Sequence, residues 1–286
     1  MTAAVARKPQ PRAPRFALPA GATDTHCHVF GPQAKFPYAA GRRYTPAEAP
    51  KEMLAALHKR LGIERTVIVQ ASCHGSDNAA MLDAIADDPA RLRGVAIVDD
   101  SFDAAALARL HEGGVRGVRF NFVRHLGGAP DEGVFQRVID RIRGLGWHVV
   151  LHLDAPDIVP LAPMIRALPL PFVIDHMGRV PAKDGVSQPA FQALLELVRL
   201  DNCWIKVCGS ERISEAPYTA AIPFARALVA VAPSRVLWGT DFPHPNLAHV
   251  PDEADLVDLV PQMAPTPEAQ RRLLVENPAR LYGFRA

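Results

Sequence analysis

Short apolar runs alternate with longer stretches of helical spacing from residue 22 to the C-terminal part of the chain. The apolar runs predict strands over residues 22–30, 65–72, 92–98, 115–122, 147–153, 171–176, 203–207 and 235–240. The stretches between and after them predict helices over residues 46–61, 77–88, 103–112, 131–144, 157–168, 188–200, 218–231 and 267–282. In the sixth of these, Leu194, Leu195, Leu197 and Val198 outline an apolar face that predicts burial.

Eight strands, each followed by a helix, predict an α/β protein with a single-domain (β/α)8 TIM barrel over residues 21–286. The same alternation also fits a doubly wound open sheet. The barrel is favoured because most of the apolar runs end in polar residues. All strand ends meet on one face of a barrel, whereas an open sheet gathers polar groups at its switch point. Residues 1–20 are expected to form a flexible N-terminal arm.

The first apolar run ends in an H-x-H pair, His26 and His28. Residues i and i+2 of a strand share a face, so both imidazoles are expected to point the same way. A lone buried histidine is more often tied to a backbone carbonyl than functional. Two of them at the end of a buried strand indicate binding or catalysis, because burying such groups without a partner is costly.

The other apolar runs also end in groups that bind or react. These are Ser72 and His74; Arg119 and Asn121, with Arg124 and His125 beyond; His152 and Asp154; Asp175 and His176; Lys206 and Cys208, with Arg212 beyond; and Asp241, with His244 and Asn246 in the next loop. Ser72 and His74 also suit an ordinary turn. Arg119 also suits a structural ion pair, although a substrate carboxylate would match its guanidinium group.

Two chemistries fit this set of residues. His26, His28, His152, His176 and Asp241 offer imidazole and carboxylate ligands to a catalytic zinc ion. Without a metal, the imidazoles would polarise a carbonyl group while Asp241 removes a proton from water. Spacing along the chain does not decide between the two. A serine nucleophile at Ser72 is less favoured, because no G-x-S-x-G pattern supports it.

The composition narrows the classes of function. With 286 residues, 49% hydrophobic and 22% charged, the chain is typical of globular proteins. A net charge of +2 gives no argument for nucleic acid, and no run is long enough to span a membrane. The N-terminus shows no apolar signal-peptide core, and the four cysteines form no C-x-x-C pair. We therefore expect a cytoplasmic protein with reduced thiols, monomeric or a small homo-oligomer.

Several motifs together resemble the amidohydrolase superfamily, and within it the 2-pyrone-4,6-dicarboxylate lactonases. They are D-T-H-C-H-V-F-G-P at residues 24–32, F-P-Y at 36–38, R-Y at 43–44, V-Q-A-S-C-H-G at 69–75, R-G-V-R-F-N-F at 116–122, I-D-H-M-G-R at 174–179, W-G-T-D-F-P-H-P-N at 238–246 and E-N-P-A-R-L-Y at 276–282. The H-x-H start is shared across a wide superfamily. The A-S-C-H-G, R-F-N-F and W-G-T-D-x-P-H-P-N segments are more specific, and the resemblance runs from about residue 20 to the C-terminus.

The resemblance implies a (β/α)8 barrel that hydrolyses a small anionic lactone, such as 2-pyrone-4,6-dicarboxylate from aromatic breakdown, without a metal cofactor. It implies that His26, His28 and His176 polarise the lactone carbonyl and that Asp241 activates water. The matching substrate contacts are Tyr44, Ser72, Arg119 and Arg212, with His244 and Asn246 in the loop beyond Asp241. We add His74, Arg124 and His152 as candidate substrate contacts.

The chain departs from that branch at two places. His152 stands where those lactonases have Tyr, and Arg124-His125 stands where they have a Lys-Arg pair. The first departure restores a fuller set of zinc ligands, and the second moves or removes one carboxylate-binding Arg. A zinc-dependent hydrolase or decarboxylase, a sulfomuconolactone or sugar-acid lactone hydrolase, and a lactone isomerase therefore stay open as enzyme alternatives. A non-catalytic binder of aromatic acids or lactones is the alternative outside enzymes.

Overall fold

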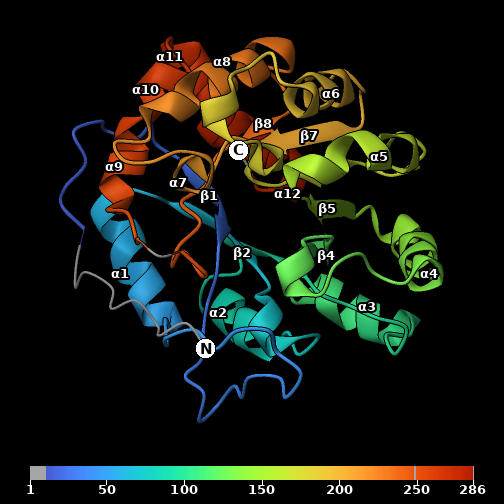
Figure 1. The fold of residues 1–286 in the computed structure, drawn as a ribbon. Coiled ribbons are helices and arrows are strands. Elements are labelled where there is room, and N and C mark those ends of the chain that lie inside the picture. Colours follow the sequence, from blue (N-terminus) through green and yellow to red (C-terminus); the bar gives the residue numbers. More distant parts are fainter. Residues whose placement is uncertain (1–10, 248, 286) are drawn as a thin grey trace.

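Eight parallel strands pair in the order in which they occur along the chain (Figure 1). The structure is a computed structural model that describes residues 11–247 and 249–285. The strands are β1 (Thr23–Cys27), β2 (Arg65–Val69), β3 (Leu92–Ala96), β4 (Val115–Asn121), β5 (His148–His152), β6 (Phe172–Ile174), β7 (Cys203–Lys206) and β8 (Val236–Leu237). All eight predicted strands are present. Most are shorter than predicted, because their polar ends belong to the loops that follow.

The barrel closes along a seam between β1 and the segment that follows β8. Across it, the Thr25 amide donates to the Trp238 carbonyl at 3.0 Å and the Asp241 amide to the His26 carbonyl at 2.7 Å. The buried carboxylate of Asp24 adds to the seam by accepting from the amides of His26 (2.9 Å) and Thr240 (3.1 Å). An open doubly wound sheet has no such seam, so the predicted (β/α)8 barrel is confirmed.

Helices surround the barrel and follow the predicted alternation (Figure 1). They are α1 (Lys51–Leu61), α2 (Ala79–Asp87), α3 (Ala104–Glu112), α4 (Glu132–Ile142), α5 (Ala155–Arg166), α6 (Pro189–Val198), α8 (Ile222–Val231), and a last segment built from α11 (Pro267–Arg271), the π-turn η7 (Arg272–Glu276) and α12 (Asn277–Tyr282). Three short helices were not predicted, α7 (Ser210–Ile213), α9 (Glu253–Asp258) and α10 (Val260–Met263). They are too short to show a clear helical period in the sequence.

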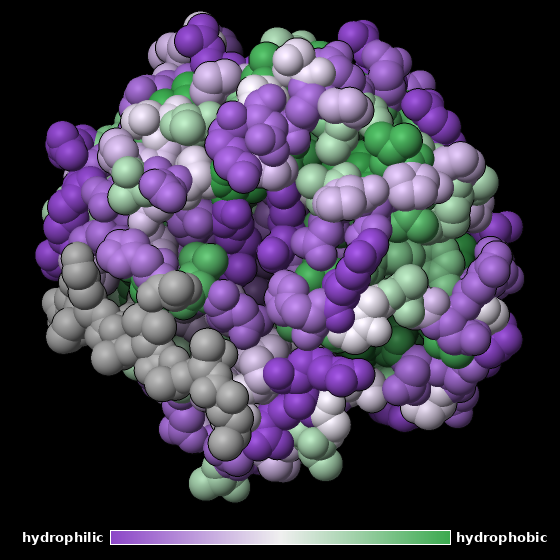
Figure 2. Space-filling view, in the orientation of Figure 1, coloured by the Kyte–Doolittle hydropathy of each residue, from purple (hydrophilic) through white to green (hydrophobic). Residues whose placement is uncertain are grey.

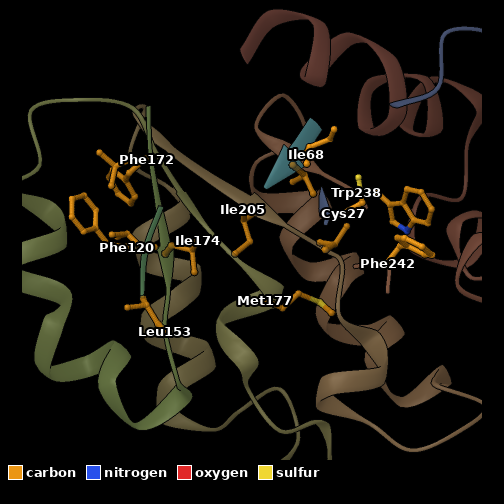
Figure 3. Close-up of a cluster of buried hydrophobic side chains, with 14 of the residues drawn as sticks. Cys27, Ile68, Phe120, Leu153, Phe172, Ile174, Met177, Ile205, Trp238 and Phe242 are labelled. Atoms are coloured by element: carbon orange, nitrogen blue, oxygen red, sulfur yellow. The ribbon is translucent and has the colours of Figure 1, made fainter. Parts of the chain in front are cut away.

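Alternation along the strands separates two apolar cores. Side chains such as Ile68, Ile174 and Ile205 belong to the larger core between strands and helices (Figure 3). Their neighbours Val69 and Val173 belong to a smaller core inside the barrel. Because successive side chains of a strand face opposite sides, polar residues in register with the inner set also point into the barrel.

A bulge in β1 aims the first histidine. Asp24 pairs with Thr66 and Cys27 with Ile68, so three residue steps on β1 match two on β2. A bulge adds one residue to a strand and re-aims the side chains around it. Cys27 therefore packs in the outer core while His26 and His28 face the barrel interior, as the H-x-H spacing predicts.

The chain's C-terminal segment fills the barrel end opposite to those histidines. Tyr282 and Phe284 pack in the inner core. Arg93 donates to the carbonyls of Tyr282 and Gly283, both at 3.2 Å, and its guanidinium carbon lies 4.9 Å from the centre of the Phe284 ring. These contacts close the amino-terminal end of the strands and leave the polar groups at the carboxyl-terminal end.

The described part of the N-terminal arm, residues 11–20, is held against α9. The Arg12 guanidinium contacts Asp255 at 2.6 Å and Asp258 at 2.5 Å, and the amides of Arg15 and Phe16 donate to Asp258. The first ten residues of the predicted flexible arm lie outside the described residues. Among the described residues, no helix combines the length and apolar character that crossing a membrane requires.

Gly239 in the seam gives a test of this packing. A Cβ atom there would lie 2.6 Å from the His26 amide nitrogen and 2.8 Å from an Asp24 carboxylate oxygen. We expect Gly239→Ala to lower the free energy of unfolding by about 1–3 kcal/mol, because the strands must move apart. Urea denaturation measures this. Gly144→Ala is the matched control, since a Cβ there meets no atom within 4 Å; equal stability of the two variants would contradict the seam.

Candidate active site

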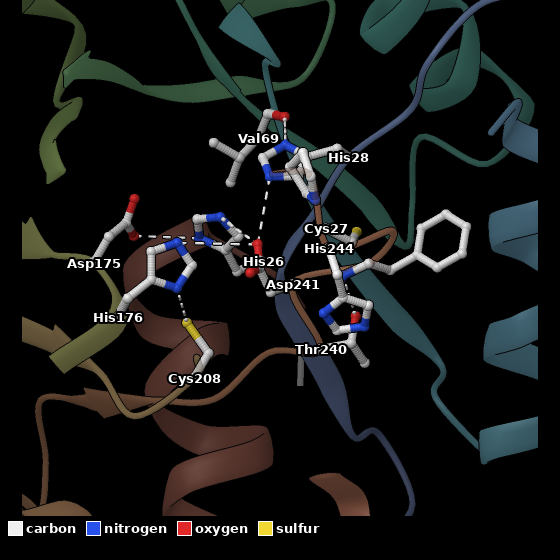
Figure 4. Close-up of polar contacts among 12 residues, drawn as sticks. His26, Cys27, His28, Val69, Asp175, His176, Cys208, Thr240, Asp241 and His244 are labelled. Carbon is white, nitrogen blue, oxygen red and sulfur yellow. Dashed lines mark hydrogen bonds and ion pairs between the residues drawn. The ribbon is translucent and has the colours of Figure 1, made fainter. Parts of the chain in front are cut away.

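Three imidazoles meet around one carboxylate at the carboxyl-terminal end of the barrel (Figure 4). The Nε2 atoms of His26, His28 and His176 lie 3.6, 3.6 and 3.9 Å from Asp241 Oδ1. All four side chains are buried. The structure therefore brings together the four residues that the sequence analysis assigned to the reaction.

The backbone around Asp241 is shaped to present its carboxylate. Asp241 has a φ of +61°, and His244 and Asn246 in the same loop also have positive φ. Non-glycine residues adopt this region rarely, and such positions gather at functional sites. The Asp241 carbonyl accepts from the His244 amide at 2.7 Å, which holds the turn that aims the side chain inward.

The two oxygens of Asp241 have different surroundings. Arg212 donates from Nε to Oδ2, whereas Oδ1 has no hydrogen-bond partner among the described residues. Burial opposes ionisation of Asp241, but the charge of Arg212 and the neighbouring imidazoles outweigh it and hold the pKa well below its usual value. Asp241 is therefore an ionised carboxylate with one oxygen open toward the imidazoles.

Each imidazole is fixed through its other nitrogen. His28 Nδ1 donates to the Val69 carbonyl at 2.8 Å. His176 Nδ1 lies 3.3 Å from the Cys208 sulfur. A Cβ atom on Gly209 would lie 2.9 Å from the same His176 nitrogen. Gly209, at φ +79°, is therefore the residue that lets the chain pass His176 so closely.

A second buried carboxylate, Asp175, lies behind His26. Lys206 Nζ is 3.1 Å from Asp175 Oδ1, and Arg119 Nε is 3.1 Å from Asp175 Oδ2. Burial opposes ionisation of Asp175, but Lys206, His26 and Arg119 hold its pKa well below the usual value. Arg119 thus has the structural ion pair that was one of its two predicted roles. The bond uses Nε, so the terminal guanidinium nitrogens are not part of it.

A third arginine joins Arg119 and Arg212. Arg179 pairs with Asp154 through Nε at 2.9 Å. Burial and the charges of Arg212 and Arg119 lower the pKa of Arg179, whereas the carboxylates of Asp154 and Asp241 oppose this change. Burial and then the charges of Arg179 and Arg212 lower the pKa of His125, so this residue lies near the two arginines.

Tyr44 and Ser72 lie beside this cluster, as the motifs suggested. Tyr44 is partly buried, and burial and then the Cys73 thiol raise its pKa, whereas Ser72 and the charge of Arg119 oppose the rise. His74 has a different surrounding. Its Nδ1 faces the Pro37 carbonyl at 3.3 Å and its Nε2 accepts from the Gly31 amide at 3.4 Å. His74 therefore holds the loop of residues 31–38.

His152 faces the site from β5. Its ring centre is 5.3 Å from that of His176, and its Nδ1 is 2.8 Å from Asn121 Oδ1. Arg119 lies two residues before Asn121 on β4, so the two side chains share one face of that strand. Burial, with Arg119 and His176, lowers the His152 pKa well below its usual value, so the ring is neutral.

His244 lies in a pocket of acidic groups rather than beside the imidazoles. Its Nδ1 is 3.2 Å from Glu211 Oε1 and its Nε2 is 3.6 Å from Glu253 Oε1. Burial alone would lower its pKa, but the two glutamates raise it to about 9. His244 is therefore protonated at neutral pH and links the Asp241 loop to α7 and α9.

Two candidates lie away from this cluster. The Arg124 side chain is 82% exposed and pairs with Asp157 at 3.6 Å, because the turn η2 (Arg124–Leu126) carries it outward. Asn246 is exposed on the loop after Asp241. Asp175, Lys206 and Arg179 had no role assigned from the sequence. Their position in or just after apolar strands was the available signal, whereas their partners come from strands far away in the chain.

The imidazoles and Asp241 also fit a zinc ion. Ligand atoms of His26, His176 and Asp241 all lie within 4.8 Å of one another. The ligands of a tetrahedral zinc ion are about 3.4 Å apart, close to the 3.6 Å between His28 or His26 Nε2 and Asp241 Oδ1. His26 Nε2 and Asp241 Oδ1 have no hydrogen-bond partner among the described residues. These residues could therefore hold a metal.

The protein surface is hollowed over the middle of the barrel, and hydrophilic side chains surround the hollow (Figure 2). This surrounding suits a polar ligand better than an apolar one.

Known proteins resemble this chain over nearly its whole length. A family described as an amidohydrolase matches residues 23–284. A 2-pyrone-4,6-dicarboxylate hydrolase of Comamonas testosteroni is 48% identical over 95% of this chain and 93% of its own. A 4-sulfomuconolactone hydrolase of Rhizobium radiobacter is 44% identical over 94% and 92%.

A solved structure from Acinetobacter baumannii is described as a probable 2-pyrone-4,6-dicarboxylic acid hydrolase with citric acid bound. It has a TM-score of 0.81 and 30% identity, covering 92% of this chain and 100% of its own.

The raised pKa of His244 predicts a change of stability with pH. The folded state favours the protonated ring, so this contribution is complete below the ordinary pKa of 6.5 and is lost as the pH rises through about 9. We expect unfolding free energies at pH 6 and pH 9.5 to differ by about 3 kcal/mol more in the wild type than in His244→Gln. Urea denaturation at the two pH values measures the difference, and an equal pH dependence in both proteins would contradict it.

Proposed function

Because this chain belongs to the amidohydrolase family, we propose that it hydrolyses a small carboxylated lactone, with 2-pyrone-4,6-dicarboxylate as the expected substrate in the breakdown of aromatic compounds. One observation carries the proposal. An ionised carboxylate with a free oxygen lies among three imidazoles, next to a cluster of guanidinium groups. The first part suits water attack on a carbonyl, and the second suits a substrate with carboxylates.

The guanidinium cluster supports an anionic substrate. Arg119, Arg179 and Arg212 each contact a protein carboxylate through Nε. Burial and then the charges of Arg212 and Arg119 lower the pKa of Arg179, and a bound anion would favour its charged form. Guanidinium groups bind carboxylates with two parallel hydrogen bonds, which would orient the ring. The relative from Acinetobacter baumannii holds citric acid, a tricarboxylate.

The reaction follows from the placement of the groups. The lactone carbonyl lies among the imidazoles of His26, His28 and His176, which stabilise the negative charge that develops on its oxygen. Asp241 Oδ1 takes a proton from water as the water oxygen bonds to the carbonyl carbon. The bond from that carbon to the ring oxygen then breaks. The released ring oxygen takes up a proton, and Asp241 returns to its ionised form.

We propose that this reaction needs no metal. His26, His28, His176 and Asp241, with His152 nearby, would hold zinc, which when bound supplies Lewis-acid polarisation of a carbonyl. Two protein cations already contact the residues that would bind the zinc ion. Arg212 donates to Asp241, and Lys206 lies 3.1 Å from His26 Nδ1. Both add positive charge beside the ligand atoms, which disfavours a divalent cation.

A second candidate substrate is 4-sulfomuconolactone, on which a relative 44% identical is named to act. A sulfonate offers the same negatively charged oxygens to the arginines as a carboxylate does. His152, which stands where the resembled lactonases have Tyr, lies near Arg119, one of these three arginines. A lactone panel with both compounds decides between them.

Turnover of the expected substrate tests the proposed reaction directly. We expect the purified protein to open 2-pyrone-4,6-dicarboxylate, seen as loss of pyrone absorbance and confirmed by mass analysis of a product one water heavier. Asp241→Asn should lower kcat by at least about 10³-fold, because the amide cannot take the proton from water. The variant should still bind the lactone, measured by calorimetry.

Other outcomes of the panel have definite meanings. Turnover of 4-sulfomuconolactone alone would reassign the substrate and keep the mechanism. Binding across the panel without turnover would favour a carrier or sensor and contradict the proposal. Near wild-type turnover by Asp241→Asn would remove Asp241 as the base.

The metal content of the purified protein tests whether the reaction needs zinc. We expect protein purified without added metal to contain far less than one zinc per chain by elemental analysis. Treatment with a chelator should leave kcat unchanged. Stoichiometric zinc whose removal abolishes turnover, and whose return restores it, would contradict the metal-independent reaction.

A further inference from the structure

Lys206 is a buried charge that the proposed reaction does not use. It lies on β7 and its side chain is fully buried at the carboxyl-terminal end of the barrel. Nζ is 3.1 Å from His26 Nδ1 and 3.1 Å from Asp175 Oδ1. The imidazole of His26 therefore has a lysine on one nitrogen and the reacting groups on the other.

The contact with Lys206 determines which nitrogen of His26 carries the proton. An ammonium group has donors and no acceptor, so His26 Nδ1 must accept from it. Asp175 Oδ1 lies 3.2 Å from the same nitrogen and competes with Lys206 for it, because a proton on Nδ1 would donate to this oxygen. The contact of Lys206 Nζ with Nδ1 at 3.1 Å has hydrogen-bond geometry and favours the accepting form of Nδ1.

An imidazole that accepts a hydrogen bond at Nδ1 has its one ring proton on the other nitrogen. With Nδ1 accepting, that proton lies on Nε2, which faces Asp241 Oδ1 at 3.6 Å.

We propose that Lys206 is a positioning residue that keeps the His26 proton on Nε2, where it donates to the carbonyl oxygen of the substrate. The catalytic part of this inference rests on the proposed lactone hydrolysis. The position of the proton does not, because it follows from contacts within the protein.

The two histidines of the H-x-H pair are held differently at Nδ1. His28 Nδ1 donates to the Val69 carbonyl, which can only accept, whereas His26 Nδ1 accepts from Lys206.

Nuclear magnetic resonance on substrate-free enzyme tests the proton position. With ¹⁵N-labelled histidine, the signals of His26 are assigned by their loss in His26→Gln. We expect the His26 proton on Nε2 in the wild type and in Lys206→Gln, whose amide keeps a donor. In Lys206→Met we expect it on Nδ1, donating to Asp175. His28 should have its proton on Nδ1 throughout, as an internal reference.

Kinetics test the catalytic role. Lys206→Met should lower kcat by about 10²-fold, the effect of removing one donor to a developing oxyanion, with KM within about threefold. Lys206→Gln should recover most of that loss. Lys51→Met, which removes a lysine paired with Asp83 and Asp87 on the surface, is the control for losing an ion pair. Asp175 keeps Arg119 in every variant, and thermal unfolding confirms that each one folds.

Three results would overturn the proposal. A wild-type His26 with its proton on Nδ1 contradicts it directly, without any variant. A proton that stays on Nε2 in Lys206→Met removes the role of Lys206. A proton that moves without a change in kcat removes the catalytic consequence. If the wild type opens no lactone, the resonance data still decide the proton position, so failure of the proposed function is seen separately.

Discussion

The charges buried at the carboxyl-terminal end of the barrel are the constraint on which the rest of the structure depends. Asp175 and Asp241 are fully buried, and a buried carboxylate without partners would lose its charge or unfold the protein. Arg212 forms an ion pair with Asp241, and Asp175 forms ion pairs with both Lys206 and Arg119. These cations come from different strands and loops, so the charge balance exists only when the whole barrel has formed.

The same balance determines what the site can do. Asp241 stays ionised because of Arg212, yet keeps one oxygen free. His26 stays neutral because it is buried, yet has a charged donor behind it. Arg119, Arg179 and Arg212 contact their carboxylate partners through Nε, and Arg212 also donates from Nη2 to the Pro245 carbonyl. The proposed base, carbonyl activator and anion receptor therefore share one set of contacts, and a change in any member alters the others.

Much of this could be predicted from the sequence, for a physical reason. A period of two places His26 with His28, and Arg119 with Asn121, on one face, and the parallel order brings all strand ends together. Other features depend on distant partners. The pairing of Lys206 with His26 joins strands 180 positions apart, and the outward turn of Arg124 depends on a short helix. The bulge in β1 leaves no mark in the hydrophobic pattern.

The seam between β1 and the segment after β8 bears on how the protein is made. Its bonds join residues more than 200 positions apart, such as Thr25 and Trp238 at 213. Contacts of such separation form late, and a nascent chain lacks the second partner until most of it has left the ribosome. Until then His26 and Asp241 are not neighbours. A partly synthesised chain therefore exposes unpaired strand edges and has no hydrolytic site, so chaperone protection would matter most just before β8 emerges.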